Sequence, residues 1–229
     1  MTRAEELAAN LAAVEERVSA ACAAAGRSRA DVTVVAITKT WPASDVELLR
    51  DLGMRDVGEN RDAEAAEKAA AIRGVRWHFI GAVQTNKARS VSSYADVVHS
   101  VDRPALVAAL AKGAVHAGRE VEVLVQVSLD GDPDRGGAPP ADVPALAEQA
   151  AAADGLRLAG VMAVAPLGAD PAPAFARLAE LYDAVRRQHP EATVLSAGMS
   201  GDLEQAVAAG ANCLRVGTAL LGHRTPVLG

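Results

Sequence analysis

The chain has 229 residues, half of them hydrophobic, which suits one sizeable domain with a single buried core. Its 23 Lys and Arg are scattered and its formal net charge is -6, so no basic stripe indicates nucleic-acid binding. Residues 1–14 carry charges where a signal peptide has its apolar core, and no apolar run reaches the roughly 18 residues of a membrane span. We therefore expect a cytoplasmic protein that binds neither nucleic acid nor membrane.

The predicted elements alternate between helix and strand along the chain. An amphipathic helix over 3–24 ends at Gly26, and a β-branched run over 32–37 follows, of the kind buried in parallel sheets. In the next helix, 44–52, Ser44 is the expected cap and Glu47 completes a capping box. Seven more strands are predicted at 55–58, 76–80, 96–99, 121–127, 156–162, 193–196 and 213–216. The further helices are predicted at 62–72, 86–91, 103–117, 141–153, 173–188, 203–209 and 218–221.

Eight strands separated by helices predict an α/β fold, a single (β/α)8 TIM barrel with an additional N-terminal helix. The competing architecture is an open doubly wound sheet, which would carry a glycine-rich turn after the first strand. Residues 38–42 read Thr-Lys-Thr-Trp-Pro there instead. No linker, repeat or low-complexity tract divides the chain, so we expect one domain over 1–229. Residues 130–140 are too polar and too rich in Gly and Pro for regular structure.

The two cysteines, Cys22 and Cys213, lie far apart and lack the spacing of a metal site or a redox motif. Cys22 falls in an Ala-rich helical stretch and Cys213 in an apolar strand. We therefore expect two buried thiols and predict no metal site.

The loops after the last two predicted strands carry Ser200-Gly201, which is expected to open the helix before the last strand, and Gly217-Thr218, which is expected to open the short helix 218–221. Glycine lets the backbone approach a ligand closely, and free N–H groups beside a hydroxyl at a helix start favour an anion. Either loop alone is also explained as an ordinary cap or turn. Because barrels of this type bind phosphate between these two loops, the pair together predicts a phosphate site.

Lys39 directly follows the first predicted strand, near the same barrel mouth. Partial desolvation there would lower its pKa and free the amine as a nucleophile. The alternative is a lysine that reaches solvent or pairs with a carboxylate at the rim, and position alone favours that alternative. An amine across the mouth from a phosphate site fits a phosphorylated aldehyde, of which pyridoxal 5'-phosphate (PLP) is the common one. The combination predicts a Schiff base between Lys39 and PLP.

Arg215 lies on the last predicted strand, two residues before Gly217. A carboxylate facing the pyridine nitrogen of PLP keeps that nitrogen protonated, whereas a guanidinium cannot accept its proton and leaves it neutral. Arg215 is therefore a candidate for the group that faces the ring nitrogen. The alternative is an ion pair between Arg215 and an acid on a neighbouring strand.

Seven short motifs follow one another at the expected ends of the barrel strands, from about residue 5 to Arg224. Together they closely resemble the pyridoxal phosphate homeostasis protein family, which is related to the N-terminal barrel of alanine racemase. Each motif alone is a weak indication of this family, but seven of them in this order are a highly specific one. They are Ala36-Ile-Thr-Lys-Thr40, Gly58-Glu-Asn60, Trp77-His-Phe-Ile-Gly81, Gln84-Thr-Asn-Lys87, His99-Ser-Val-Asp-Arg103, Gly198-Met-Ser-Gly-Asp202 and Arg215-Val-Gly-Thr-Ala219.

The resemblance implies a barrel of the alanine racemase type and a role in intracellular PLP homeostasis, in which the protein keeps, delivers or buffers the cofactor. It also implies apo forms of PLP-dependent enzymes as partners, and we expect a monomer. The implied site residues are Lys39 for the Schiff base, Ser200, Gly217 and Thr218 for the phosphate, Arg215 for the pyridine nitrogen, and Asn60 near the cofactor.

Four places depart from the usual family pattern. Ala82 replaces a histidine, Thr38 replaces a serine and Ala197 replaces a methionine. Gly136-Gly137 stands in a loop where lysine is typical of the family. The role that this loop has in the family is therefore the one least expected to apply to this chain. None of these departures involves Lys39 or the implied phosphate residues.

The alternative to a carrier without robust turnover is a PLP-dependent amino-acid racemase. Racemases of this class need a tyrosine from an extra β-domain and a partner subunit, whereas this chain stops at Gly229 and its Tyr94 and Tyr182 are expected to be structural. A phosphosugar-type isomerase or aldolase would need a base facing Lys39. Glu59 and His78 are the candidates, but His78 is expected to be a satisfied core histidine and Glu59 to bond with backbone or with Arg215. The carrier is therefore the favoured function.

Overall fold

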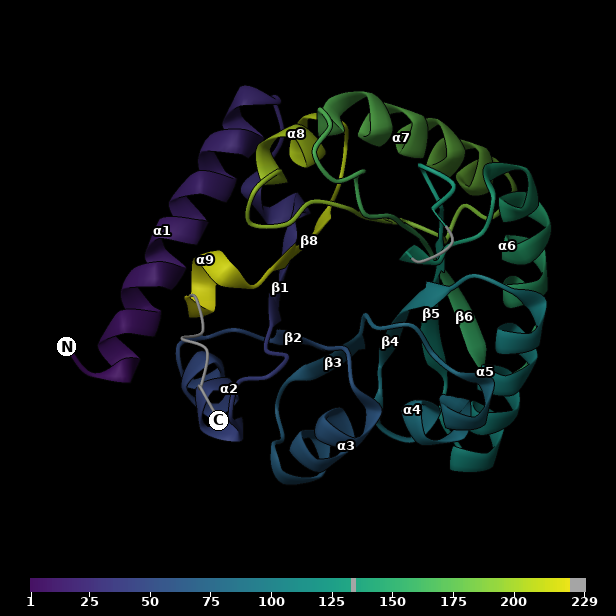
Figure 1. Ribbon diagram of the computed structural model, residues 1–229, viewed down its shortest axis with the longest axis horizontal. Coiled ribbons are helices and arrows are strands. Elements are labelled where there is room, and N and C mark those ends of the chain that lie inside the picture. The colour runs from purple at the N-terminus through teal and green to yellow at the C-terminus, as the bar shows by residue number, and fades with distance from the viewer. Residues whose placement is uncertain (133–134, 223–229) are drawn as a thin grey trace.

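The computed structural model describes residues 1–132 and 135–222, and its strands form one closed parallel barrel in the order β1 to β8 (Figure 1). This architecture confirms the predicted (β/α)8 fold. Every predicted strand is present within two residues of its expected ends. The strands are β1 Thr33–Ile37, β2 Asp56–Glu59, β3 Arg76–Phe79, β4 Val97–Val101, β5 Val121–Gln126, β6 Leu156–Met162, β7 Val194–Ser196 and β8 Cys213–Val216.

Helices surround the barrel and connect successive strands (Figure 1). They are α1 Arg3–Ala24, α2 Ala43–Asp51, α3 Asp62–Ala71, α4 Ala88–Tyr94, α5 Pro104–Ala117, α6 Val143–Ala151, α7 Pro171–Gln188, α8 Leu203–Ala208 and α9 Thr218–Leu221. Short 3-10 turns also occur within the described residues, among them η1 Arg29–Asp31, η2 Thr85–Lys87 and η4 Pro140–Asp142.

The predicted cap of α2 is wrong. Pro42 occupies the N-cap position, no side chain caps the helix, and Ser44 lies inside the first turn. The fixed φ of Pro42 favours a helix start directly after it, so the helix begins at Ala43 and Ser44 falls too late in the chain to cap it. At α1, in contrast, Thr2 and Glu5 form a complete capping box.

The two faces of the strands pack in different layers. On β1, Val34 and Ala36 belong to the large core between the barrel and the helices. Val35 and Ile37 alternate with them and pack with Cys213 of β8 in a separate small cluster. Successive side chains of a strand point to opposite faces, so this second set fills the barrel interior. Cys22 and Cys213 are both buried, as predicted.

The additional helix α1 lies outside the ring of elements, alongside α8 and α9 (Figure 1). Its apolar stripe is buried against them and comprises Leu7, Val14, Val18, Ala21 and Cys22. None of the described helices combines the length and the apolar character needed to span a bilayer.

Two of the expectations extend beyond the described residues. The loop predicted at 130–140 includes 133–134, and the single domain predicted over 1–229 includes 223–229; both segments lie outside the described part. Of the loop's described residues, Ala138 forms an isolated bridge with Val127 beside β5.

Candidate functional site

The predicted site residues gather at the carboxyl ends of the strands. Lys39 follows β1, Asn60 follows β2, and Gly217 follows β8, which pairs with β1 in the closed barrel. A Cβ placed on Gly217 would lie 3.5 Å from the Cβ of Ile37, so the loop after β8 lies against the end of β1. The structure therefore brings the Lys39 loop and the Gly217 loop to one edge of the barrel.

Lys39 itself is exposed, and among the described residues its ammonium has no hydrogen-bond or ion-pair partner. The expectation that burial at the barrel mouth desolvates this amine is therefore wrong. Of the two alternatives, the structure shows the lysine that reaches solvent, and no ion pair with a described carboxylate is formed. Lys39 presents a solvent-accessible, unpaired amine.

The backbone next to Lys39 is unusual. Thr40 has a φ of 68°, and within the described segments no other non-glycine residue has a positive φ. A β-branched residue is strained in this left-handed conformation, and such strain persists only where the surroundings hold the backbone.

Four largely buried side chains keep the backbone in this conformation. We call them the β1–α3 cluster: Thr38, Glu59, Glu64 and Lys68. Lys68 Nζ donates to Glu59 Oε1 and Glu64 Oε1 at 2.7 Å each, and to the carbonyl oxygen of Thr38 at 3.1 Å. The Thr38 hydroxyl also donates to Glu59 Oε1 at 2.7 Å. Glu64 Oε1 accepts from the N–H of Thr40 at 2.8 Å. The cluster therefore binds the backbone on both sides of Lys39.

Glu59 has the most unusual environment in this cluster. Burial raises the pKa of its carboxyl, and the hydrogen bonds from Lys68 and Thr38 oppose that rise. Its Oε2 is buried and has no partner among the described residues. The predicted bond to backbone or to Arg215 is wrong, because Glu59 pairs with Lys68. Lys68 was not predicted to contribute to the site.

The loops after β7 and β8 are joined by a hydrogen bond from the N–H of Ala219 to Ser200 Oγ, 3.1 Å long. Within the described chain, no acceptor is present for the N–H groups of Ser200, Gly201, Gly217 and Thr218. The prediction that Ser200-Gly201 opens the helix is wrong, because α8 begins at Leu203. The prediction for Gly217-Thr218 is confirmed, since Gly217 is the N-cap of α9. Four free donors beside a shared hydroxyl favour an anionic ligand.

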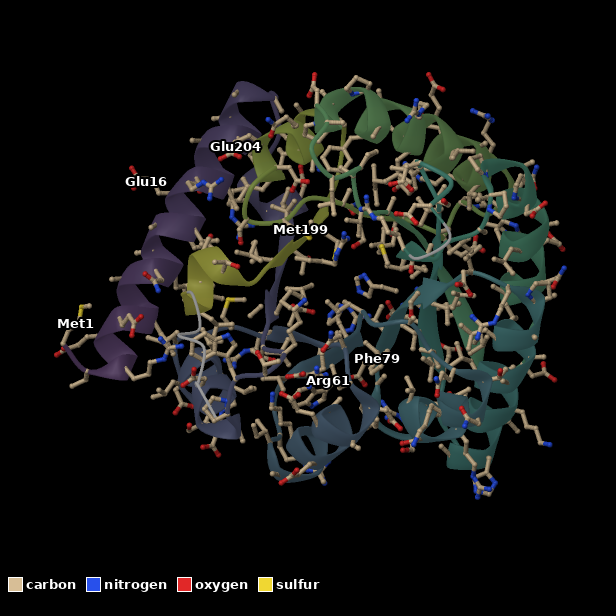
Figure 2. All side chains as sticks on the ribbon, in the orientation of Figure 1. Met1, Glu16, Arg61, Phe79, Met199 and Glu204 are labelled. Atoms are coloured by element: carbon tan, nitrogen blue, oxygen red, sulfur yellow. The ribbon has the colours of Figure 1, made fainter. Side chains whose placement is uncertain are left out.

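Side chains of helix α1 donate hydrogen bonds to the loop after β7 and to the helix α9 that follows β8. Arg17 Nη1 donates to the carbonyl oxygen of Ser200 at 3.1 Å, and Arg17 also pairs with Glu204 of α8. Asn10 Nδ2 donates to the carbonyl oxygen of Leu220 in α9 at 2.9 Å. In Figure 2, Glu204 lies beside α1, whereas Glu16 points away from it. Neither Asn10 nor Arg17 was predicted to contribute to the site.

Arg215 lies inside the barrel and is 4% exposed. Its Nη1 donates to Ser196 Oγ at 2.7 Å and its Nη2 to the carbonyl oxygen of Ala163 at 2.8 Å. It forms no ion pair with any described acid, so the alternative of a neighbouring carboxylate is excluded for these residues. Burial lowers the pKa of this guanidinium below its usual value, although arginine stays charged in proteins.

Asn60 was expected near the cofactor only from the family resemblance. Its Oδ1 is buried and has no partner in the described chain. A buried amide oxygen is nearly always hydrogen-bonded, so this atom is suited to a group that the protein itself does not supply.

The competing candidates have structural roles. His78 is a satisfied core histidine, as expected, with one ring nitrogen on His99 and the other on Asp56, each at 2.9 Å. The Tyr94 hydroxyl contacts Asp62 at 3.3 Å, and the Tyr182 hydroxyl donates to the carbonyl oxygen of Thr193 at 2.7 Å. Burial raises the pKa of both tyrosines, so neither hydroxyl is suited to act as a base.

A cavity of about 560 Å³ lies away from the barrel mouth, between α3, α4 and the turn before β3. Its charged side chains Asp96 and Arg119 neutralise each other in a 2.6 Å ion pair. The unpaired amine and the free N–H groups are at the mouth, so the mouth is the better candidate despite this cavity.

Comparison with known proteins identifies the family. The family described as "Alanine racemase, N-terminal domain" matches residues 9–225. The chain is 44% identical to the "Pyridoxal phosphate homeostasis protein" of Mycobacterium bovis, over 97% of this chain and 94% of that protein. It is 34% identical to the protein of the same name in Escherichia coli K12, over 96% of this chain and 97% of that protein.

Solved structures agree with the sequence comparison. PipY of Synechococcus elongatus with PLP bound has a TM-score of 0.81 and 34% identity, covering 94% of this chain and 100% of that chain. Alanine racemase from Corynebacterium glutamicum, at 16% identity and a TM-score of 0.71, shows the shared fold alone; the match covers 99% of this chain and 62% of that one. The chain therefore belongs to the pyridoxal phosphate homeostasis protein family, whose barrel is that of the N-terminal domain of alanine racemase.

Proposed function

We propose that this protein binds PLP at the barrel mouth, holds it as a Schiff base on Lys39, and serves intracellular PLP homeostasis without robust turnover. The observation that carries the proposal is the unpaired amine of Lys39 at the same barrel edge as four free N–H donors. The names of the curated relatives and the PLP bound to PipY support the same cofactor and role.

The side chains and backbone at the mouth fit this cofactor chemically. Phosphate requires several hydrogen-bond donors, and Ser200, Gly217 and Thr218 offer N–H and hydroxyl groups. The aldehyde requires a nucleophilic amine, which Lys39 supplies. The buried Oδ1 of Asn60, which lacks a partner among the described residues, is available to a ligand group at the same edge.

Arg215 supports holding the cofactor in preference to processing a substrate. Bound PLP supplies an electron sink when its ring nitrogen is protonated. A guanidinium facing that nitrogen cannot accept its proton, and no described carboxylate pairs with Arg215. Because Tyr94 and Tyr182 are both engaged in structural hydrogen bonds, the racemase alternative also lacks a tyrosine base in the described chain.

The test is covalent capture. Wild-type protein with PLP is expected to absorb at about 420 nm, and borohydride reduction is expected to leave a modified Lys39 in peptide mass spectrometry. Lys39→Ala is expected to abolish both signals, whereas Lys112→Ala, at an exposed position on α5, serves as the matched control. Finding no modified lysine in saturated wild-type protein would overturn the proposal.

Turnover tests the second half of the proposal. The PLP-loaded protein is assayed for racemase and transaminase activity across the common amino acids. A carrier is expected to turn over far more slowly than about 1 per second, and a rate at or above that value would indicate an enzyme instead.

A further inference from the structure

Five polar side chains form one continuous hydrogen-bonded chain across the barrel interior. Arg215 Nη1 contacts Ser196 Oγ at 2.7 Å, and Ser196 Oγ contacts His99 Nδ1 at 3.1 Å. His99 Nε2 contacts His78 Nδ1 at 2.9 Å, and His78 Nε2 contacts Asp56 Oδ1 at 2.9 Å. We call this set, Asp56, His78, His99, Ser196 and Arg215, the interior chain.

The interior chain arises from strand alternation. Its residues occupy β2, β3, β4, β7 and β8, in each case at a position that alternates with at least one apolar residue of the core between barrel and helices, and so points into the barrel. Asp56 is the first residue of β2 and therefore lies at the end opposite the mouth. The rings of His78 and His99 also line a cavity of about 130 Å³, to which Arg76 and Glu122 contribute opposite charges.

The donor and acceptor roles along the chain follow from its two ends. A guanidinium only donates, so Ser196 Oγ accepts from Arg215 and its own hydrogen is free to donate to His99 Nδ1. His99 then carries its proton on Nε2 and donates to His78 Nδ1. His78 in turn carries its proton on Nε2 and donates to the Asp56 carboxylate. In this arrangement every link has one donor and one acceptor, and both imidazoles are neutral.

The opposite orientation is electrostatically less favourable. If His78 donated to His99, its Nε2 could satisfy the Asp56 carboxylate only by carrying a second proton, which would make His78 a buried imidazolium. Burial, together with the nearby positive charges of Arg215 and Arg76, keeps the pKa of His99 well below its usual value. Two neutral rings avoid adding a further cation to an interior that already contains Arg215.

We infer that Asp56 acts as the remote counter-charge of Arg215, connected through His78, His99 and Ser196. A buried cation without a paired anion is strongly unfavourable. The charge of Asp202 raises the pKa of Arg215, but no described carboxylate forms an ion pair with Arg215. An aligned chain of hydrogen bonds polarises each of its members and so carries part of the carboxylate's effect across the barrel. Asp56, His78, His99 and Ser196 are then positioning residues for Arg215.

The inference has a consequence for the ligand that rests on the proposed function. The interior chain and the carbonyl oxygen of Ala163 occupy Nη1 and Nη2 of Arg215, while its Nε has no acceptor among the described residues. The orientation of the guanidinium at the ring nitrogen of bound PLP, and the positive potential there, would both depend on Asp56.

The first experiment needs no ligand. The imidazole ¹⁵N shifts of the apo protein are measured at neutral pH, and His78→Gln and His99→Gln are used to assign them. Both rings are expected to be neutral with the proton on Nε2. An imidazolium at His78, or a proton on Nδ1 of either ring, overturns the inference whether or not PLP binds.

The second experiment measures coupling to the mouth. The absorbance of the PLP-loaded protein is titrated with pH for wild type, Asp56→Asn, Ser196→Ala and the conservative Asp56→Glu. Loss of the negative charge disfavours the protonated form of the Lys39-bound cofactor, so the midpoint for Asp56→Asn is expected to fall by about half a pH unit. Ser196→Ala is expected to shift it in the same direction, and Asp56→Glu to restore the wild-type midpoint.

The outcomes are distinguishable. Glu120→Gln, which removes an exposed charge just before β5, is the matched control and is expected to titrate as wild type. Wild-type midpoints for Asp56→Asn and Ser196→Ala would overturn the coupling. If wild-type protein shows no PLP band, the proposed function fails, and the ¹⁵N measurement alone then decides whether the interior chain is oriented as inferred.

Discussion

At the scale of single residues, the reactivity of Lys39 depends on how the backbone beside it is held. Thr38 and Thr40 flank it, and Thr40 has a strained φ of 68°. The β1–α3 cluster contacts the carbonyl of Thr38 and the N–H of Thr40, so a buried ionic group in α3 fixes both neighbours of an exposed lysine. The Lys39 side chain is therefore exposed to solvent, while the backbone on both sides of it is held by hydrogen bonds.

Substitution of Lys68 tests this anchor. Lys68→Met leaves the carboxylate of Glu59, only 1% exposed, without its cation, and is expected to cost about 3–5 kcal/mol of unfolding free energy in urea denaturation. The double variant Glu59→Gln, Lys68→Met removes both charges and is expected to recover most of that loss. A loss below about 1 kcal/mol for Lys68→Met would contradict a buried ionic anchor.

The proposed site residues could be predicted from the sequence better than the side chains that hold them in place. Lys39 and Arg215 could be found because each has a fixed position relative to a strand that the apolar pattern reveals. Lys68 lies in an Ala-rich helix with acids around it, a pattern typical of a solvated surface. It is buried because the loop after β1 folds against α3, and that contact between distant segments has no local signal.

At the scale of elements, α1 explains why the fold carries a helix outside the eightfold repeat. Its apolar stripe packs on α8 and α9, and its polar side chains reach the carbonyls of Ser200 and Leu220. These bonds leave the N–H groups of the two loops free, since they engage only carbonyl oxygens. The helix thus stabilises the proposed phosphate loops without occupying their donors.

Removing one of these supports is expected to weaken ligand binding more than folding. Arg17→Ala loses the bond to the Ser200 carbonyl, a contribution of about 1 kcal/mol, and is expected to raise the Kd for PLP about fivefold. Binding is measured by fluorescence titration. Glu16→Ala, the neighbouring exposed position on α1, is the control and is expected to bind as wild type. Equal affinity of Arg17→Ala and wild type would show that α1 does not support the loop.

The positions of the strands and helices could be predicted from the sequence, but the residues at which the helices begin were predicted less well. Strand β6, Leu156–Met162, and strand β8, Cys213–Val216, begin and end where the apolar pattern places them. Ser44 and Ser200 were both assigned to helix starts and lie elsewhere. A hydroxyl can cap a helix or serve a turn or a neighbouring loop, and only the tertiary contacts decide which, as the bond from Ala219 to Ser200 shows.

At the scale of the whole molecule, the barrel interior is part apolar and part polar, and of the polar part the sequence indicated a core histidine but not the hydrogen-bonded chain. Apolar runs of β-branched residues predict a closed parallel barrel because both faces of every strand must be buried. The interior chain depends on which strands become neighbours and in what register. His78 and His99 gain their partners only when β2, β3 and β4 lie side by side, so the sequence alone could indicate a core histidine without its partners.

Burial of His99 also gives the molecule a pH-dependent stability. Its pKa is lowered well below the usual value by burial first, then by the positive charges of Arg215 and Arg76. As pH falls through about 6.5, the unfolded chain takes up a proton at this position and the folded protein does not, so stability decreases. Glu59, whose pKa is raised by burial, acts with the opposite sign at lower pH, because there the folded state binds the extra proton.

The contribution of His99 can therefore be isolated by comparing how steeply the free energy of unfolding changes with pH in wild type and in a variant that lacks His99. Urea denaturation of wild type and His99→Gln between pH 7 and pH 5 is expected to show a wild-type stability that falls more steeply with acid, by up to about 1.4 kcal/mol per pH unit. His116→Gln, on the exposed side of α5, controls for loss of a histidine. Equal slopes for wild type and His99→Gln would mean that His99 takes up a proton in the folded barrel, which contradicts its neutral state in the interior chain.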